Sequence, residues 1–224
     1  MYHQYSAESL EKKAEKILTS YKDGQLLRSP QAMDVDDFAE FYCKAVIDFA
    51  NLSQDGQILG CACFNDGFWN VWNEDRTKQV PIKVCKGCIL VDNALIDNEV
   101  EGRLRFTIIH ECSHLILHPR FYYKKPNTLH KELNCSASQI ESWAKCRPKT
   151  DDDIREWQAN RLGAALIMPA QTVKMLMAEK LNIGVPALTS VCLSDVFTQE
   201  MADVFRVSNT AMRYRLRDIN LLLH

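Results

Sequence analysis

One stretch of the sequence combines residue types at a spacing that could carry out chemistry: His110-Glu111-Cys112-Ser113-His114, an HExxH motif. On a helix, positions four apart point in the same direction, so the two imidazoles can reach a single metal ion. The glutamate then lies beside the open coordination position, where it can accept a proton from water. The motif predicts a hydrolytic metal site with His110 and His114 as ligands and Glu111 as general base.

Apolar residues flank the motif on both sides, as a buried active-site helix requires. They are Leu104, Phe106, Ile108, Ile109, Leu115, Ile116 and Leu117. A helix is therefore expected over residues 99–118, ended by Pro119. The alternative is a core helix whose two histidines are only hydrogen-bonded.

A catalytic zinc site needs a third protein ligand and an open fourth position. His118 continues the four-residue spacing, but along a helix it stands about 12 Å from His110, at ~1.5 Å per residue. That separation is too large for one tetrahedral ion. We therefore expect His118 to be a helix-end residue.

Glu156 is the better candidate for the third ligand, on a helix predicted over 151–168. Asn160 lies one turn later on the same face and could accept a hydrogen bond from the far nitrogen of a ligand histidine. The alternative is a solvated acidic helix start, because residues 151–153 are all aspartate and make this terminus negative. Small residues at 163–165 would let two helices approach closely, which favours a ligand.

Two separated segments, 103–118 and 156–169, resemble the ImmA/IrrE-type metallopeptidases, which are zincin-like. Roughly residues 30–170 share the resemblance, and the runs at 58–60, 64–67 and 89–92 look like the sheet that precedes the motif in that family. The resemblance implies one zinc ion held by His110, His114 and Glu156, with Glu111 as general base. It also implies cleavage of a helix-turn-helix repressor, which would derepress genes of a mobile element or a stress response.

Substrate binding needs further groups. A second donor to the substrate oxygen is usual, and Tyr122, Tyr123 and His130 are candidates in a polar stretch, 119–150, that is predicted to be a loop or lid. Surface aromatic packing is the alternative for each. An edge strand, either 80–84 or 88–92, could hold an extended substrate by β-pairing.

The remaining elements must position these residues. Hydrophobic spacing and capping residues predict helices over 6–21 and 34–50, and a further helix over 170–181. Short β-branched or aromatic runs, separated by turn residues, predict strands over 57–64, 67–72, 80–84 and 88–92. The expected fold class is α+β: a zincin-like metallopeptidase core, with a small antiparallel sheet packed on helices and an HExxH active-site helix.

A second, smaller part is expected at the C-terminus. The chain is predicted to divide into a metallopeptidase domain, 1–184, and a helical unit, 185–224. Residues 201–217 are typical of a helix-turn-helix, with Ser208 as the cap of the second helix.

This C-terminal unit leaves two interpretations open. Arg213, Arg215 and Arg217 make its second helix basic, which would suit phosphate contacts with DNA. Against direct DNA binding, Arg206 stands where the tight turn often has glycine, and alternate arginines point to different sides of a helix. A packing or partner-docking unit is the alternative. The second functional hypothesis is thus a non-proteolytic regulatory protein that binds DNA or a repressor through these helices.

Composition narrows the class of protein. The 224 residues include 27 Lys and Arg against 29 Asp and Glu, which excludes a uniformly basic nucleic-acid coat. The longest apolar run, 162–170, is broken by Pro169 and is far shorter than the ~18 residues of a membrane span. With no apolar signal core at the N-terminus, a cytoplasmic protein without membrane contact is expected.

The nine cysteines are an odd number and are scattered, which argues against a secreted disulfide framework. Cys61, Cys63, Cys85 and Cys88 could form a zinc ribbon. Both pairs lie in β-like apolar runs, however, so buried thiols are the favoured interpretation.

Overall fold

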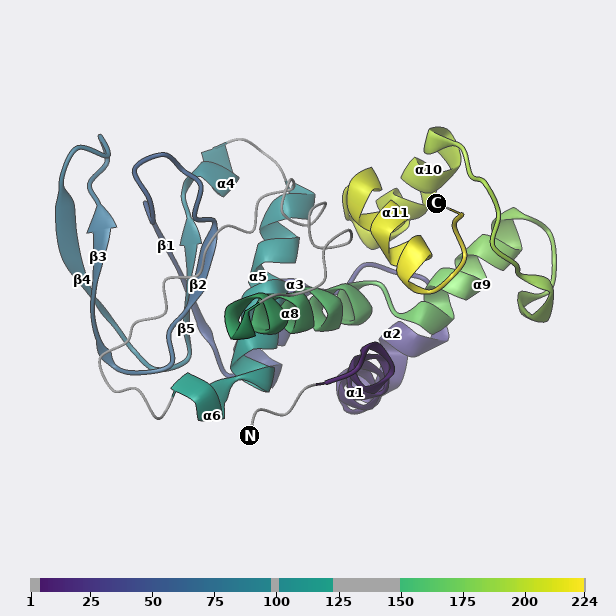
Figure 1. The fold of residues 1–224 in the computed structure, drawn as a ribbon, viewed down its shortest axis with the longest axis horizontal. Helices are drawn as coiled ribbons and strands as arrows, with labels where there is room; N and C mark the ends of the chain where they lie inside the picture. The colour runs from purple at the N-terminus through teal and green to yellow at the C-terminus, as the bar shows by residue number, and fades with distance from the viewer. Residues whose placement is uncertain (1–4, 98–100, 123–149, 224) are drawn as a thin grey trace. The chain divides into compact units, whose positions relative to one another are not determined.

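A computed structural model of the chain describes residues 5–97, 101–122 and 150–223. It is a mixed α+β protein with two small sheets and many helices. Its α-helices are α1 (Ala7–Ser20), α2 (Gln25–Arg28), α3 (Val35–Asp37), α4 (Ala94–Asp97), α5 (Glu101–Leu117), α6 (Pro119–Tyr122), α8 (Asp151–Ile167), α9 (Ala170–Lys180), α10 (Asp195–Phe205) and α11 (Asn209–Asp218). Shorter helical turns are η1 (Lys22–Gly24), η2 (Phe38–Tyr42) and η3 (Val185–Ala187), and the strands are β1 (Val46–Ala50), β2 (Gly60–Ala62), β3 (Gly67–Trp72), β4 (Gln79–Val84) and β5 (Cys88–Asp92) (Figure 1).

The chain divides into two compact units. One unit is Val35–Asn160, which holds both sheets, α5 and the first part of α8. The other joins Met1–Asp34 to Arg161–His224, and within it α2 packs against α9. The domain boundary predicted between residues 184 and 185 does not coincide with the boundaries of these two units, and it stays a prediction.

The larger sheet has the strand order β1-β5-β2. β1 runs parallel to β5, with Val46 opposite Cys88, and β2 runs antiparallel to it, with Gly60 opposite Val91. β3 and β4 pair antiparallel as a separate two-stranded sheet. The strands predicted at 67–72 and 88–92 have those bounds, and the other two overlap β2 and β4. The single antiparallel sheet is wrong, because β1 adds a parallel pairing and the hairpin stands apart.

The missing strand, β1, lies in the segment predicted as one helix over 34–50. The helical part ends with η2, and Lys44 has a φ of 58°, which interrupts the helix. Val46 and Ile47 are β-branched and pack better on a pleated sheet than in a helix. The apolar spacing was misleading because Phe41 and Phe49 are 65% and 40% exposed, so they form no core-facing stripe.

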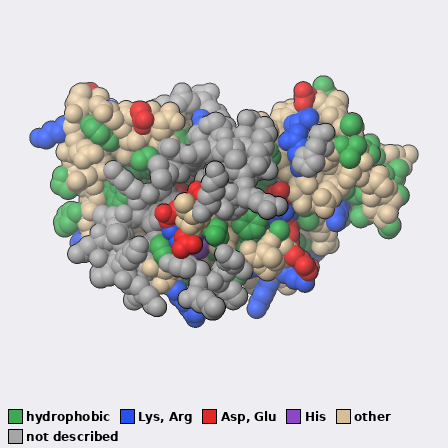
Figure 2. All heavy atoms as spheres, in the orientation of Figure 1, with side chains coloured by type: hydrophobic (Ala, Val, Ile, Leu, Met, Phe, Trp, Pro, Cys, Tyr) green, Lys and Arg blue, Asp and Glu red, His purple; other side chains and the backbone are tan. Residues whose placement is uncertain are grey.

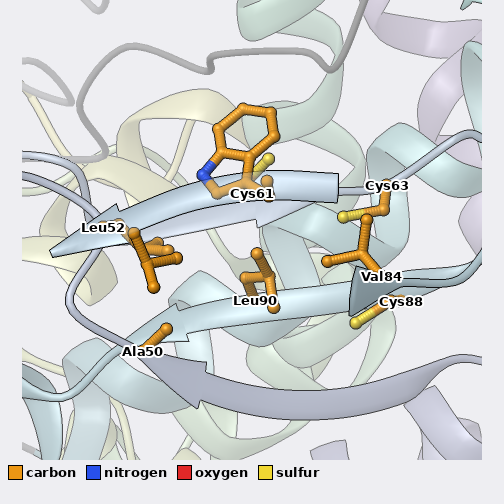
Figure 3. Packing of buried hydrophobic residues seen from close by; sticks show 9 residues of the cluster. Ala50, Leu52, Cys61, Cys63, Val84, Cys88 and Leu90 are labelled. Atoms are coloured by element: carbon orange, nitrogen blue, oxygen red, sulfur yellow. The ribbon is translucent and has the colours of Figure 1, made fainter. Parts of the chain in front are cut away.

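The strands of both sheets enclose an apolar core that contains three of the cysteines. The buried cluster consists of Ala50, Leu52, Cys61, Cys63, Trp69, Val71, Val84, Cys88 and Leu90 (Figure 3). The fourth cysteine of the zinc-ribbon alternative, Cys85, is exposed. A hydrogen bond with Cys61 and burial raise the pKa of the Cys63 thiol, against an opposing hydrogen bond with Cys88. A hydrogen bond with Cys63 and burial raise the pKa of the Cys88 thiol, so both thiols are protonated at neutral pH. These cysteines pack as buried thiols, as favoured above.

The second unit is tied together by a buried arginine. Arg215 of α11 is 1% exposed, and its guanidinium donates to Glu11 Oε1 and Oε2 of α1 at 2.5 and 2.9 Å. Its Nε donates to the Met168 carbonyl at 2.8 Å. A guanidinium held in this way is not available to a phosphate. The neighbouring Arg213 pairs with Asp195 at 2.8 Å.

The turn between α10 and α11 follows the predicted chemistry. Ser208 caps α11, because its side chain accepts a hydrogen bond from the Ala211 N–H at 3.1 Å. Arg206 occupies the left-handed region at the end of α10, with a φ of 53°, where glycine is more usual. The two helices pack against each other. That this unit is a helix-turn-helix stays a prediction, and its binding to DNA stays an open interpretation.

The described residues also bear on membrane spanning and on surface charge. None of the helices in them is both long and apolar enough to cross a membrane. Figure 2 shows both acidic and basic side chains on one face of the molecule.

Candidate metal centre

The HExxH motif lies in the last two turns of α5. Ten consecutive residues of this helix, 105–114, are buried, and α5 packs against β2 and β5 (Figure 1). Because this part of α5 is buried on all of its faces, apolar residues are expected before and after the motif in the sequence. His110, Glu111 and His114 are therefore held inside the protein.

Glu156 is positioned by the start of α8. Thr150 and Asp153 cap this helix reciprocally: the Asp153 N–H donates to Thr150 Oγ1 at 3.0 Å, and the Thr150 N–H donates to Asp153 Oδ2 at 2.9 Å. The acidic first turn suits the positive end of the helix dipole. Glu156 comes one turn later and is buried, so the alternative of a solvated helix start is wrong for it.

The two helices bring His110, His114 and Glu156 together. The Nε2 atoms of the two histidines are 3.0 Å apart. Glu156 Oε2 lies 3.3 Å from His110 Nε2, and Glu156 Oε1 lies 3.3 Å from His114 Nε2. Within the ranges that the structure describes, this is the group of His, Cys, Asp and Glu side chains able to hold a metal, with ligand atoms all within 4.8 Å of one another.

These distances fit a tetrahedral divalent ion. Ligand atoms ~2.05 Å from such an ion lie about 3.3 Å from one another. The observed separations of 3.0 and 3.3 Å match this value. Two imidazole nitrogens and one carboxylate also form a donor set that catalytic zinc sites use. The three residues thus fit a metal ion with a fourth position left open.

The neighbouring histidines determine the ionisation of Glu156. Burial by itself raises the pKa of Glu156, but the charges of His114 and His110 and their hydrogen bonds outweigh it, and the net pKa is well below its ordinary value. Glu156 is therefore a carboxylate at neutral pH. This is the form that binds a metal.

Glu111 is 1% exposed and faces β2. Its carboxyl group accepts a hydrogen bond from the Ala62 N–H, and Oε2 has no hydrogen-bond partner among the described residues. Burial raises the pKa of Glu111 above its ordinary value, against the opposing charges of His110 and His114. A buried carboxyl group with one unpartnered oxygen and a raised pKa suits a proton-transfer group.

Gly60 of β2 provides the space that Glu111 occupies. A Cβ atom at this position would stand 2.6 Å from Thr107 Cγ2 and 2.8 Å from Glu111 Oε1, both closer than van der Waals contact allows. The φ of Gly60 is not positive, so the position needs a glycine for space and not for backbone conformation.

We expect Gly60→Ala to lower any activity that depends on Glu111 by about tenfold or more, because small displacements of a reacting group are costly. The matched control is Gly67→Ala, since a Cβ at Gly67 of β3 has nothing within 4 Å. Steady-state rates and thermal unfolding of both variants check this. A Gly60→Ala variant with the unchanged rate of Gly67→Ala would show that Glu111 tolerates the displacement.

His118 and Gln158 form a contact that the sequence did not indicate. His118 follows the last residue of α5, as predicted, and it is not one of the three grouped ligands. Its Nδ1 lies 3.0 Å from His114 Nδ1, and its Nε2 lies 3.1 Å from Gln158 Oε1. Burial lowers the pKa of His118 to about 3, so the ring is neutral. The four-residue spacing between His114 and His118 is the signal in the sequence that could have indicated this contact.

The structure describes the remaining predicted site residues only in part. Asn160 is half-buried one turn after Glu156, and its contact with a ligand histidine stays a prediction. Tyr122 is the last residue of α6, whereas its side chain, Tyr123 and His130 lie outside the described residues.

The predicted substrate-binding strand is in part wrong. The segment 88–92 is β5, which is paired on both sides and presents no edge. The segment 80–84 is in β4, which belongs to the separate two-stranded sheet. At the edge of the larger sheet, the strand that packs against α5 is β2.

Comparison with known families adds an independent finding. A family model for peptidase family M78, described as the IrrE N-terminal-like domain, matches residues 94–217, which is more than half of the chain. The matched range contains both α5 and α8, and so all four residues of the site. No curated protein matches the chain.

Proposed function

The chain belongs to peptidase family M78, the IrrE N-terminal-like domain family, and on this premise we propose that it is a zinc-dependent metallo-endopeptidase. Membership confirms the resemblance predicted from the two motifs, although the matched region begins at residue 94 and extends to 217, beyond the predicted limit of about 170. The observation that carries the proposal is the convergence of His110, His114 and Glu156 within 4.8 Å.

Nε2 of His110, Nε2 of His114 and the carboxylate of Glu156 would hold the ion. When bound, zinc supplies Lewis acidity, which lowers the pKa of a water molecule toward ~7 and polarises the carbonyl of the scissile peptide bond. Burial of all three side chains keeps bulk water away from the ligand atoms, which strengthens electrostatic interactions there.

Glu111 would act as the proton-transfer group. The Ala62 N–H holds its carboxyl group, which leaves Oε2 able to take a proton from the attacking water. The same carboxyl group would then deliver that proton to the nitrogen of the leaving amine. A raised pKa suits both steps, because the group must accept a proton and also release it.

We further propose that the substrate is a helix-turn-helix transcriptional repressor, and that its cleavage derepresses genes of a mobile element or a stress response. An extended segment of the repressor would pair with the edge of β2, which lies beside α5 and donates the Ala62 N–H to Glu111. None of the described cysteines is part of a disulfide, which suits action in the reducing cytoplasm.

The test examines the peptidase activity and the identity of the substrate independently. The purified chain is incubated with the repressor encoded next to its gene, and separately with a random peptide library read by mass spectrometry. We expect discrete fragments from both, abolished by a chelator and restored by zinc. Cleavage of the library alone would contradict the repressor as substrate, and no cleavage of either would contradict the peptidase.

The alternative is a non-proteolytic protein that binds DNA or a repressor through its C-terminal helices. It predicts a stable complex without fragments. Burial of Arg215 against Glu11 weakens the DNA form of this alternative, because one of the three arginines on which it depended is engaged inside the protein.

A further inference from the structure

A chain of hydrogen bonds leads from His114 to a glutamine on α8. His114 Nδ1 lies 3.0 Å from His118 Nδ1, and His118 Nε2 lies 3.1 Å from Gln158 Oε1. All three side chains are buried. Gln158 stands two residues after Glu156, so the two segments that supply the ligands also supply this chain.

The two ring nitrogens of His114 face different neighbours. Nε2 faces His110 Nε2 and the Glu156 carboxylate at 3.0 and 3.3 Å, whereas Nδ1 faces His118. A neutral imidazole carries one N–H and one lone pair. If His114 offers its Nε2 lone pair to a metal, its hydrogen must be on Nδ1. That N–H needs an acceptor, and His118 Nδ1 is at hydrogen-bond distance.

Gln158 decides which nitrogen of His118 is the acceptor. The amide oxygen Oε1 can only accept, so His118 Nε2 must carry the hydrogen and donate it. His118 Nδ1 is then left with a lone pair for His114. With the opposite arrangement, His118 would donate from Nδ1, and His114 would have to carry its hydrogen on Nε2, where it blocks a metal.

We propose that His118 and Gln158 are positioning residues that fix His114 in the tautomer whose Nε2 binds the metal. The inference rests on the proposed zinc peptidase function and gives a role to two residues outside the ligand set. Partners of this kind orient a ligand histidine and raise its basicity. His118 acts through His114, since its Nδ1 lies against the ring nitrogen of His114 that does not face Glu156.

The test measures the zinc affinity of the metal-free chain by competition with a chromophoric chelator. His118→Phe keeps an aromatic ring but removes the acceptor, and we expect it to weaken zinc binding about 10- to 100-fold. Gln158→Leu removes the acceptor at the end of the chain and weakens binding in the same direction. Gln158→Glu, whose carboxylate can only accept, retains the wild-type affinity.

Nitrogen-15 NMR of the imidazole rings gives a readout that a general loss of stability would not move. Metal-free wild type and Gln158→Glu are expected to carry the His114 hydrogen on Nδ1. Metal-free Gln158→Leu is expected to show a mixture of the two His114 tautomers, because nothing then fixes His118.

Thr172→Val is the control variant. It removes a buried hydrogen bond to the Pro169 carbonyl at 3.2 Å and should leave zinc affinity unchanged. Circular dichroism checks folding, and the two Gln158 variants carry the test if His118→Phe does not fold.

Wild-type affinity in folded Gln158→Leu would overturn the inference, as would a Gln158→Glu variant as weak as Gln158→Leu. A wild-type chain that binds no zinc overturns both the inference and the peptidase. If the wild type binds zinc but cleaves no peptide, the proposed function fails while the affinity ratios still decide the role of His118 and Gln158.

Discussion

Replacing Glu111 with glutamine is expected to reduce peptide cleavage by about 10²- to 10⁴-fold, the usual contribution of a positioned general base. Glutamine has nearly the same shape but cannot accept the proton of an attacking water. Zinc should stay bound, because Glu111 is not among the three grouped ligands. The measurements are the rate of cleavage and the zinc content of the same purified sample.

Glu101→Gln is the matched control, since Glu101 is the exposed first residue of the same helix and the change removes the same charge. We expect this control to cleave at the wild-type rate. An unchanged rate in Glu111→Gln would remove its assignment as general base. A loss of zinc together with activity would instead show that Glu111 helps to hold the metal.

The parts of this protein that depend on local sequence could be predicted. The spacing of His110 and His114 requires only the geometry of one helix turn, and α5 provides it. The caps of α1 and α11 at Ser6 and Ser208 are likewise local hydrogen bonds within four residues. Glu156 could be proposed because it lies near the start of a second predicted helix and one acid was needed to complete a ligand set.

The parts of the structure that depend on long-range packing could not be predicted from the sequence. β1 pairs with β5 across about 40 residues of sequence, and its apolar spacing also fits a helix. The contact between His118 and Gln158 joins positions 40 residues apart and appears only when α5 and α8 are folded. Arg215 looked like a surface cation because its partner, Glu11, stands near the other end of the chain.

Replacing Glu156 with alanine is expected to weaken zinc binding by more than ~100-fold. Removing a residue that only hydrogen-bonds to a metal ligand already weakens metal binding by about 10- to 100-fold. Glu156 itself provides one of the three ligand atoms, so its loss should weaken binding further. The change also removes the carboxylate whose two oxygens lie 3.3 Å from the Nε2 atoms of His110 and His114. Cleavage should be lost with the metal, and added zinc at high concentration should restore part of both.

Asp151→Asn tests whether charge alone explains the effect, since Asp151 is an exposed acid at the start of the same helix. It should bind zinc as the wild type does. Glu156→Ala and Glu111→Gln then separate two roles within one site: the first loses zinc and activity together, and the second loses activity alone. Full zinc affinity in folded Glu156→Ala would mean that a different group completes the metal site, and the pairing of α5 with α8 as the catalytic centre would be wrong.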